Sequence, residues 1–262
     1  MRSSWNLRRK MQSIYYRVRG FYPVDIAGRR FRVHPDDRRF WRKLAHGKWE
    51  PHTFKILAKF LRPRTVYLDI GAWIGPTILF AAAHDAEVYC FEPDGVAYRQ
   101  LLSNLQLNSM DNVHPFHAAV FTYDGVVNIG NAEEFGNSES RISPNKQFAL
   151  SARVPCVKIE TAMQLWQLDT VDMIKIDIEG AEFELLPAMA TCLKKQKPVV
   201  YLSIHAPFFD ASVRPQLMQN IISLAQQYRY SLDRDLQPLK PQELLSSRYT
   251  DKFAELVLTD HM

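Results

Sequence analysis

The chain has 262 residues, of which 47% are hydrophobic and 23% are charged, as is usual for a globular protein. Its formal net charge of +5 favours an acidic partner or an anionic surface without identifying either. No apolar run approaches the ~18 residues of a membrane-spanning helix, and no apolar signal segment follows the basic N-terminus. Cys90, Cys156 and Cys192 are too widely spaced for a metal clip, so we expect free thiols and a cytoplasmic protein.

Residues 1–48 are predicted to form a basic N-terminal extension. Residues 1–20 have the pattern of an amphipathic helix, and residues 24–33 that of a hairpin with Ala27-Gly28 as its turn. Nine Arg and Lys residues precede position 35, with aromatic residues between them. Two interpretations stay open: residues 1–22 contact a membrane surface or RNA, or the helix packs on the domain by its aromatic side.

Residues 49–262 are predicted to form one α/β domain. A helical stretch over 37–61, broken near Gly47 and Pro51, leads into it. Strands are expected at 66–70, 87–92, 113–117, 171–178, 199–204, 228–232 and 255–259, and helices at 75–83, 95–108, 180–194 and 213–228. This alternation indicates βαβ crossovers and a mostly parallel sheet of about seven strands.

Residues from about 118 to 160 interrupt this alternation. Short β-like pieces at 126–129 and 154–159 flank a polar stretch from Asn131 to Lys146. We expect an inserted hairpin with a mobile loop, which is a candidate substrate lid because long loops in compact domains are often functional.

The loop after the first strand of the domain, Asp69-Ile70-Gly71-Ala72-Trp73-Ile74-Gly75, is the first candidate ligand site. Ligands bind at the carboxyl ends of such strands, and Glu92, which ends the next strand before Pro93, is placed to accept hydrogen bonds from ribose hydroxyls. Trp73 and Pro76 occupy the second and third glycine positions of a dinucleotide fingerprint, and no phosphate-binding G-K-[ST] is present. The loop therefore suits S-adenosylmethionine (SAM), which has no phosphate, better than NAD or ATP.

The second informative stretch is Ile174-Lys175-Ile176-Asp177-Ile178-Glu179-Gly180-Ala181-Glu182. Asp177 ends a buried strand, and its side chain is expected near the Gly71 loop, where it suits a general base or a Mg²⁺ site. We assign no metal ligands from the sequence. Glu179 and Glu182 can also be explained as helix N-terminal acids that favour the helix dipole.

These two stretches, together with Phe91-Glu92-Pro93, resemble the FkbM family of SAM-dependent methyltransferases. The resemblance runs from about Trp49 to His205. It implies a Rossmann-like class I methyltransferase fold in which the last strand of a seven-stranded sheet is antiparallel. It also implies O-methylation of a hydroxyl on a sugar, a polysaccharide or a secondary metabolite.

The resemblance also implies how the cofactor lies. Asp69, Gly71 and Gly75 would line the methionine end of SAM, Glu92 the ribose, and His117 and Ala118 the adenine. The predicted cofactor residues are Glu50, Asp69, Gly71, Ala72, Trp73, Gly75, Glu92, Pro93, His117, Ala118 and Asp177. Glu50 is included because it could reach the amino group of SAM, although it also suits a helix N-terminus before Pro51.

The candidate catalytic residues are Asp177, Glu179 and His205. His205 ends a strand on the same sheet edge as Asp177 and could take a proton from a hydroxyl. The sequence departs from the family pattern at Ser203, where an acid is usual, and this puts in doubt a mechanism that needs a carboxylate there. Three alternatives stay open: an RNA methyltransferase that uses the basic arm, a non-catalytic SAM-binding scaffold, and a nicotinamide oxidoreductase.

Overall fold

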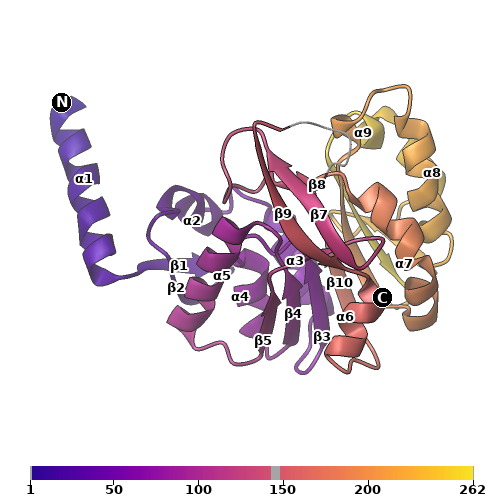
Figure 1. Ribbon diagram of the computed structural model, residues 1–262, viewed down its shortest axis with the longest axis horizontal. Helices are drawn as coiled ribbons and strands as arrows, with labels where there is room; N and C mark the ends of the chain where they lie inside the picture. The colour runs from indigo at the N-terminus through magenta and orange to yellow at the C-terminus, as the bar shows by residue number, and fades with distance from the viewer. Residues whose placement is uncertain (1, 143–147, 262) are drawn as a thin grey trace.

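The computed structural model describes residues 2–142 and 148–261. The N-terminal part forms a helix, a hairpin and a second helix: α1 (Arg2–Arg19), β1 (Tyr22–Ile26), β2 (Arg29–Val33) and α2 (Arg38–Ala45). In Figure 1, α1 extends away from the rest of the molecule. The predicted helix and hairpin are confirmed, and the turn lies at Ala27-Gly28, where both φ angles are positive.

A seven-stranded sheet forms the centre of the molecule, with the strand order β12-β13-β11-β10-β3-β4-β5. Its strands are β3 (Val66–Ile70), β4 (Glu87–Phe91), β5 (Val113–Phe116), β10 (Met173–Ile176), β11 (Val199–Ile204), β12 (Tyr230–Asp233) and β13 (Ala254–Thr259). Pairing is parallel from β11 to β5, whereas β13 is antiparallel to both of its neighbours. The predicted fold class, including the antiparallel last strand, is confirmed.

Helices cover both faces of this sheet. One face carries α3 (Pro51–Phe60), α4 (Pro76–Ala82) and α5 (Gly95–Asn108). The other carries α6 (Ile159–Leu165), α7 (Glu182–Gln196), α8 (Arg214–Ala225) and α9 (Ser247–Thr250), together with the short 3₁₀ helices η1 (Ala206–Phe208) and η2 (Pro241–Leu245). Because successive strand residues point to opposite faces, Tyr67 packs in the first layer and Leu68 in the second.

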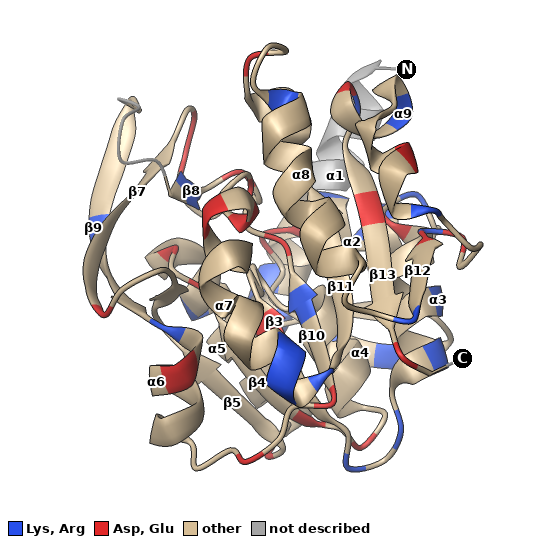
Figure 2. Cartoon of the chain, turned by 90° about the vertical axis from the view of Figure 1, so that its right-hand side faces the viewer, with Lys and Arg blue, Asp and Glu red and all other residues tan. Residues whose placement is uncertain are grey.

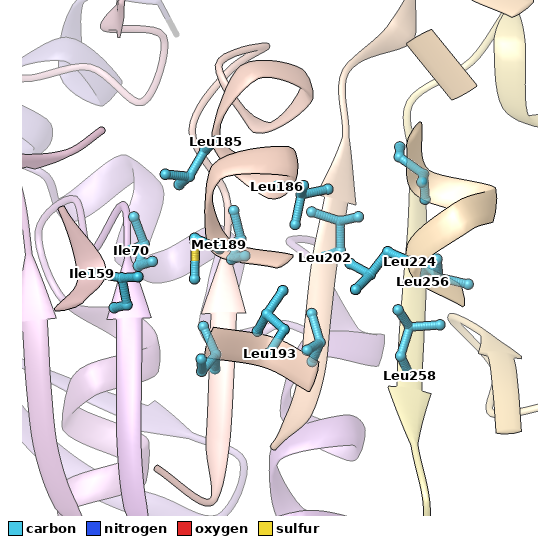
Figure 3. Packing of buried hydrophobic residues seen from close by; sticks show 14 of the residues in the cluster. Ile70, Ile159, Leu185, Leu186, Met189, Leu193, Leu202, Leu224, Leu256 and Leu258 are labelled. Atoms are coloured by element: carbon cyan, nitrogen blue, oxygen red, sulfur yellow. The ribbon is translucent and has the colours of Figure 1, made fainter. Parts of the chain in front are cut away.

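The helix α7 shows how sequence pattern sets this packing. Its apolar residues, among them Leu186, Met189 and Leu193, face Ile70 of β3 and Leu202 of β11 (Figure 3). Its first turn is acidic and its last turn is basic, as Figure 2 shows, and both charges favour the helix dipole. The helix therefore has one defined face toward the sheet and one defined end toward the carboxyl ends of the strands.

The segment between β5 and α6 forms a small separate sheet with the order β6-β9-β7-β8. Its strands are β6 (Ala119–Val120), β7 (Gly125–Asn131), β8 (Arg141–Ile142) and β9 (Leu150–Val157). The antiparallel pairing of β7 with β9 confirms the predicted hairpin. The short strands β6 and β8 and the helix α6 were not predicted, because elements of two to seven residues are too short to show a clear hydrophobic periodicity. Residues 143–147 of the predicted loop lie outside the described residues.

The N-terminal hairpin and α2 pack on the same face of the sheet as α5. Buried residues of both, such as Phe31 and Trp41, belong to the hydrophobic cluster of that face. Asn108 of α5 exchanges hydrogen bonds with the backbone of Arg32, and Asn104 accepts one from His34 N. The predicted boundary at residue 48 stays a prediction. Among the described residues, no helix is long and apolar enough to cross a membrane.

Gly71 brings the loop after β3 against the end of β10. Its φ is +95°, and a Cβ added there would overlap the carbonyl oxygen of Asp177. The Asp177 N–H in turn donates to the carbonyl oxygen of Ile70 at 3.0 Å. Glycine is therefore required at this position by a contact within the chain itself, in addition to any approach of a ligand.

We expect Gly71→Ala to lower the free energy of unfolding by about 2–5 kcal/mol, because left-handed backbone strain and steric overlap add. Gly28→Ala is the matched control, since its φ is +87° and its Cβ would meet no atom within 4 Å. In Gly28→Ala the free energy of unfolding should fall by only about 1–2 kcal/mol, because backbone strain acts there without steric overlap. Urea denaturation of both variants tests this, and equal losses would show that the contact with Asp177 costs nothing.

Candidate active site

A cavity of about 520 Å³ lies at the carboxyl ends of β3, β4, β10 and β11. This size is in the range of small-molecule and cofactor sites. Its walls come from five parts of the chain: the loop after β3, the end of β4, the start of the inserted sheet, the end of β10 and the end of β11. Residues of the insert between Asn137 and Ile142, residues between Trp49 and His52, and residues from Phe253 to Glu255 complete it.

Glu92 stands at the β4 side of this cavity. Its Oε2 accepts the Trp73 N–H at 2.7 Å and its Oε1 accepts the Asp94 N–H at 2.8 Å. Burial raises the pKa of Glu92 to about 8 in spite of these two hydrogen bonds. Each carboxylate oxygen keeps further lone pairs, so the group can still accept hydrogen bonds from a diol.

Trp73 closes the same side of the cavity with an aromatic wall. Its ring packs edge-on against Phe40 of α2 at 4.4 Å between centroids, and Phe40 packs in the same way against Trp49 at 5.0 Å. The Trp73 indole Nε1–H donates to the carbonyl oxygen of Gly136 at 2.8 Å. Trp73 therefore joins the N-terminal segment, the ligand loop and the insert.

Asp94 anchors the insert over the cavity. It caps α5 by accepting the N–H groups of Val96 and Ala97 through Oδ1. Its Oδ2 accepts the Gly136 N–H at 2.7 Å and the Ser140 hydroxyl at 2.6 Å. Since the Asp94 residue is 99% buried, these four bonds give the insert a fixed attachment beside the cavity.

A buried lysine connects the two strands at the centre of the site. The Lys175 Nζ lies 3.1 Å from Asp177 Oδ2 and 3.6 Å from Asp69 Oδ1. Burial opposes its charge, but these carboxylates outweigh that effect and raise the pKa of Lys175 above its ordinary value. Burial would likewise raise the pKa of Asp177, but Lys175 and His205 hold it below its ordinary value.

His205 is held by a carboxylate that is completely buried. Glu182 Oε1 accepts the backbone N–H of His205 at 2.7 Å and lies 3.2 Å from its ring Nδ1, while Oε2 accepts the Gly180 N–H at 2.8 Å. The other ring nitrogen, Nε2, points toward Asp177 Oδ1 at 3.5 Å and Glu179 Oε2 at 3.6 Å. Burial disfavours the protonated ring, but Glu182 and the two other carboxylates raise the pKa of His205 to about 9.

The cavity has an excess of buried carboxylates. Burial, as the largest cause, raises the pKa of Glu50, Glu179 and Glu255 to about 7 each. Neighbouring acids add to the effect, since Asp177 raises the pKa of all three. Such shifts mean that the carboxylates have too little positive charge near them. The cavity therefore suits a ligand that carries positive charge.

The structure brings most of the predicted site residues together. Those that line the cavity are Glu50, Gly71, Ala72, Trp73, Glu92, Pro93, Ala118, Asp177, Glu179 and His205. Three others lie outside its lining. Asp69 is buried beneath it, Gly75 packs against Leu101, and the exposed His117 stacks on Tyr98 with 4.8 Å between ring centroids.

Sequence reasoning gave no role in the site to four side chains that shape it: Asp94, Lys175, Glu182, which was expected only as a helix N-terminal acid, and Glu255. Lys175 and Glu182 stood inside the quoted stretch, two residues from Asp177 and from Gly180. Glu255 could not be found, because only the antiparallel pairing of β13 places it opposite Ser203 of β11. The carboxylate that Ser203 does not provide is thus present on the neighbouring strand.

Comparison with known protein families decides the class of this site. The model of the methyltransferase FkbM domain matches residues 69–232, which include Gly71, Glu92, Asp177 and His205 but not Glu50 or Glu255. The chain belongs to the FkbM methyltransferase family. No curated protein sequence matches it.

Solved structures with a similar fold share little sequence with this chain. An FkbM methyltransferase from Methylobacillus flagellatus is 15% identical with a TM-score of 0.48, and the match covers 82% of this chain and 60% of that one. A tRNA (uracil-54, C5)-methyltransferase from Pyrococcus abyssi, in complex with S-adenosyl-L-homocysteine, is 14% identical with a TM-score of 0.45, covering 91% and 44%. TYW2 from M. jannaschii, in complex with AdoMet, is 13% identical with a TM-score of 0.44, covering 91% and 84%.

Glu92→Gln should change how stability depends on pH. The pKa of Glu92 rises from 4.5 to about 8 on folding, so its protonated form stabilises the fold below 4.5, and that contribution is lost as the pH rises through about 8. The neutral glutamine should therefore become more stable relative to wild type between about pH 4.5 and 8, by up to about 1.4 kcal/mol per pH unit.

Urea denaturation without ligand at several pH values measures this difference. The glutamine variant also loses one hydrogen-bond acceptor, and the cost of that loss is the same at every pH. Only the change with pH in the difference between the two free energies of unfolding is therefore informative. Glu139→Gln, at an exposed position of the cavity rim, is the control. If the difference in free energy of unfolding between Glu92→Gln and wild type does not vary with pH, or if Glu139→Gln shows the same variation, the raised pKa of Glu92 is contradicted.

Proposed function

We propose that this methyltransferase transfers the methyl group of SAM to a hydroxyl group of a small molecule or a glycan. The observation that carries the proposal is one cavity with Glu92 on its β4 side and the converging side chains of Asp177, Glu179 and His205 on its β10 and β11 side. Family membership supports methyl transfer as the reaction class. The acceptor follows from the chemistry of the second side.

The β4 side of the cavity fits the cofactor in three respects. Glu92 has free lone pairs for the two ribose hydroxyls, as its position at the end of β4 leads one to expect. Trp73, at the position where a dinucleotide needs glycine, leaves no approach for a pyrophosphate. The excess of carboxylates suits a ligand with a sulfonium and an amino group, and disfavours a ligand with phosphates.

The other side offers groups that can manage a proton. SAM, when bound, would supply an electrophilic methyl group, which the hydroxyl oxygen accepts while its proton leaves and the sulfur departs as a thioether. Asp177 and Glu179 provide acceptors for that proton, and the His205 ring, whose raised pKa favours its protonated form, provides a hydrogen bond that orients the hydroxyl. Glu182 acts as a positioning residue, because it holds the His205 ring and backbone together.

The walls beside His205 also suit a hydroxylated acceptor. Phe208 stacks on the His205 ring at 5.5 Å between centroids, and Phe253 packs edge-on against Phe208 at 5.1 Å. Flat aromatic faces next to carboxylates and serine hydroxyls can cover the apolar face of a sugar while its hydroxyls find polar partners. The same carboxylates would repel the phosphates of RNA, so the cavity favours an uncharged or cationic acceptor over a nucleic acid.

Isothermal titration with SAM tests the cofactor assignment. We expect micromolar binding of SAM and none of NADH. Asp177→Asn should keep SAM affinity within about tenfold and lose turnover in a screen of hydroxylated acceptors. Thermal denaturation controls for folding, because the variant removes one partner of Lys175. No SAM binding by wild type would refute the cofactor, and full turnover by the variant would remove Asp177 from the reaction.

A further inference from the structure

Three side chains on the β10 and β11 side of the cavity converge without bonding to one another. One ligand atom each from Asp177, Glu179 and His205 lies within 4.8 Å of the other two. The His205 Nε2 is 3.5 Å from Asp177 Oδ1 and 3.6 Å from Glu179 Oε2, which exceeds the length of a normal hydrogen bond. In the part of the chain that the structure describes, Nε2 has no hydrogen bond, although the His205 residue is 93% buried.

These distances match the spacing of ligands around one ion. Ligand atoms at about 2.1 Å from a metal are separated by roughly 3.0–3.4 Å in octahedral or tetrahedral geometry. The two separations from His205 Nε2 are slightly longer, and the ligand atoms of Asp177 and Glu179 lie within 4.8 Å of each other, so movement of these side chains toward one another would close the set. Three protein ligands leave coordination positions open toward the cavity, as catalytic metal sites do.

The surrounding groups prepare this set of ligands. Glu182 lies 3.2 Å from the His205 Nδ1, an arrangement that keeps the proton on Nδ1 and leaves the Nε2 lone pair for a metal. Lys175 neutralises the other oxygen of Asp177, Oδ2, so that Oδ1 stays free. The ligands come from the loop after β10 and from the end of β11, whose parallel pairing fixes their relative position.

We propose that Asp177, Glu179 and His205 bind one divalent cation next to the methyl acceptor. The single imidazole among oxygen ligands favours a first-row transition ion such as Mn²⁺ over Mg²⁺. The role of the ion rests on the proposed function: it would coordinate the acceptor hydroxyl and make the proton of that hydroxyl easier to remove.

Titration of the chelator-treated full chain with Mn²⁺, followed by electron paramagnetic resonance, tests the site without SAM or acceptor. One ion should bind per chain, and Mg²⁺ should compete at least about tenfold more weakly. Glu179→Gln should weaken Mn²⁺ binding by about 10–100-fold. Glu255→Gln, which removes a carboxylate from the same cavity outside the ligand set, should change it by less than about threefold.

Each outcome is informative. No stoichiometric Mn²⁺ binding by a folded wild-type chain would overturn the metal site, and so would equal weakening in the two variants, which would indicate general attraction by the acidic cavity. Since the measurement needs no SAM, a negative result would leave the SAM titration and the proposed methyl transfer untouched. Circular dichroism of each variant confirms that its fold is retained.

A different observation concerns the surface of α1. Four large apolar side chains of this helix are exposed: Met11, Ile14, Tyr15 and Val18, with exposed fractions of 62%, 62%, 56% and 84%. Their spacing of three, four and seven residues places them in one stripe along the helix. In Figure 1 this helix extends away from the domain, so the described part of the chain does not cover the stripe.

Charge in the chain is strongly divided between this segment and the rest. Residues 1–48 contain 14 of the 33 Lys and Arg but only three of the 28 Asp and Glu, so they carry +11 and residues 49–262 carry −6. The helix α1 contains no acidic residue. Beside it, α2 adds Arg38, Arg39, Arg42 and Lys43.

We infer that α1 lies on an anionic lipid surface, with its apolar stripe in the interface and its basic residues near the lipid phosphates. A stripe with aliphatic Met, Ile and Val favours lipid over RNA, because binding to RNA uses stacking aromatic rings and phosphate contacts. The acidic remainder of the chain would face away from such a surface.

Vesicle sedimentation with the full chain tests this. We expect binding to phosphatidylcholine vesicles with about 30% phosphatidylglycerol, and at least about tenfold weaker binding to pure phosphatidylcholine. Val18→Asp should lose about tenfold in affinity, whereas Leu165→Asp, the same type of change at a 59% exposed position of α6, should lose little. No binding to anionic vesicles, or equal losses in both variants, would overturn the inference, as would binding of RNA alone.

Discussion

The buried ammonium group of Lys175 is the interaction on which this site depends. It stands in β10, next to β3, and holds the carboxylates of Asp69 and Asp177 at the centre of the parallel sheet. Removing one member of such a buried set leaves an uncompensated charge, so the three residues act as a unit. Asp69 is further held by the hydroxyls of Tyr67 and Thr77, and Asp177 thereby gains a fixed position at the cavity.

The cavity combines this rigid centre with an excess of negative charge. Glu50, Glu92, Glu179 and Glu255 come from four separate parts of the chain; Glu92 is buried and the other three are partly buried, and burial raises the pKa of each. Such an arrangement costs stability in the absence of a ligand, and it is retained where binding requires it. A sulfonium cofactor and a divalent cation are the two kinds of ligand that would relieve it, and they would do so on different sides of the same cavity.

The N-terminal segment follows a different physical logic. Its hairpin and α2 complete one face of the core, and Phe40 of α2 supports the aromatic wall at Trp73. The helix α1 contributes to neither, and its apolar side chains Met11, Ile14, Tyr15 and Val18 are exposed. The segment thus joins the basic helix α1 to the aromatic wall of the cavity through α2.

The sequence by itself determined the elements of the central sheet and the chemistry at the ends of three of its strands. Alternation of strands and helices predicted the sheet, and the residues at the ends of β3, β4 and β10 marked the site, because parallel strands bring their carboxyl ends to one edge. Only the tertiary structure decided which of these residues face the cavity. His117 turns outward to stack on Tyr98, while Glu255 reaches the site through the antiparallel β13. Such placements depend on pairing and packing between distant segments, and local periodicity carries no information about them.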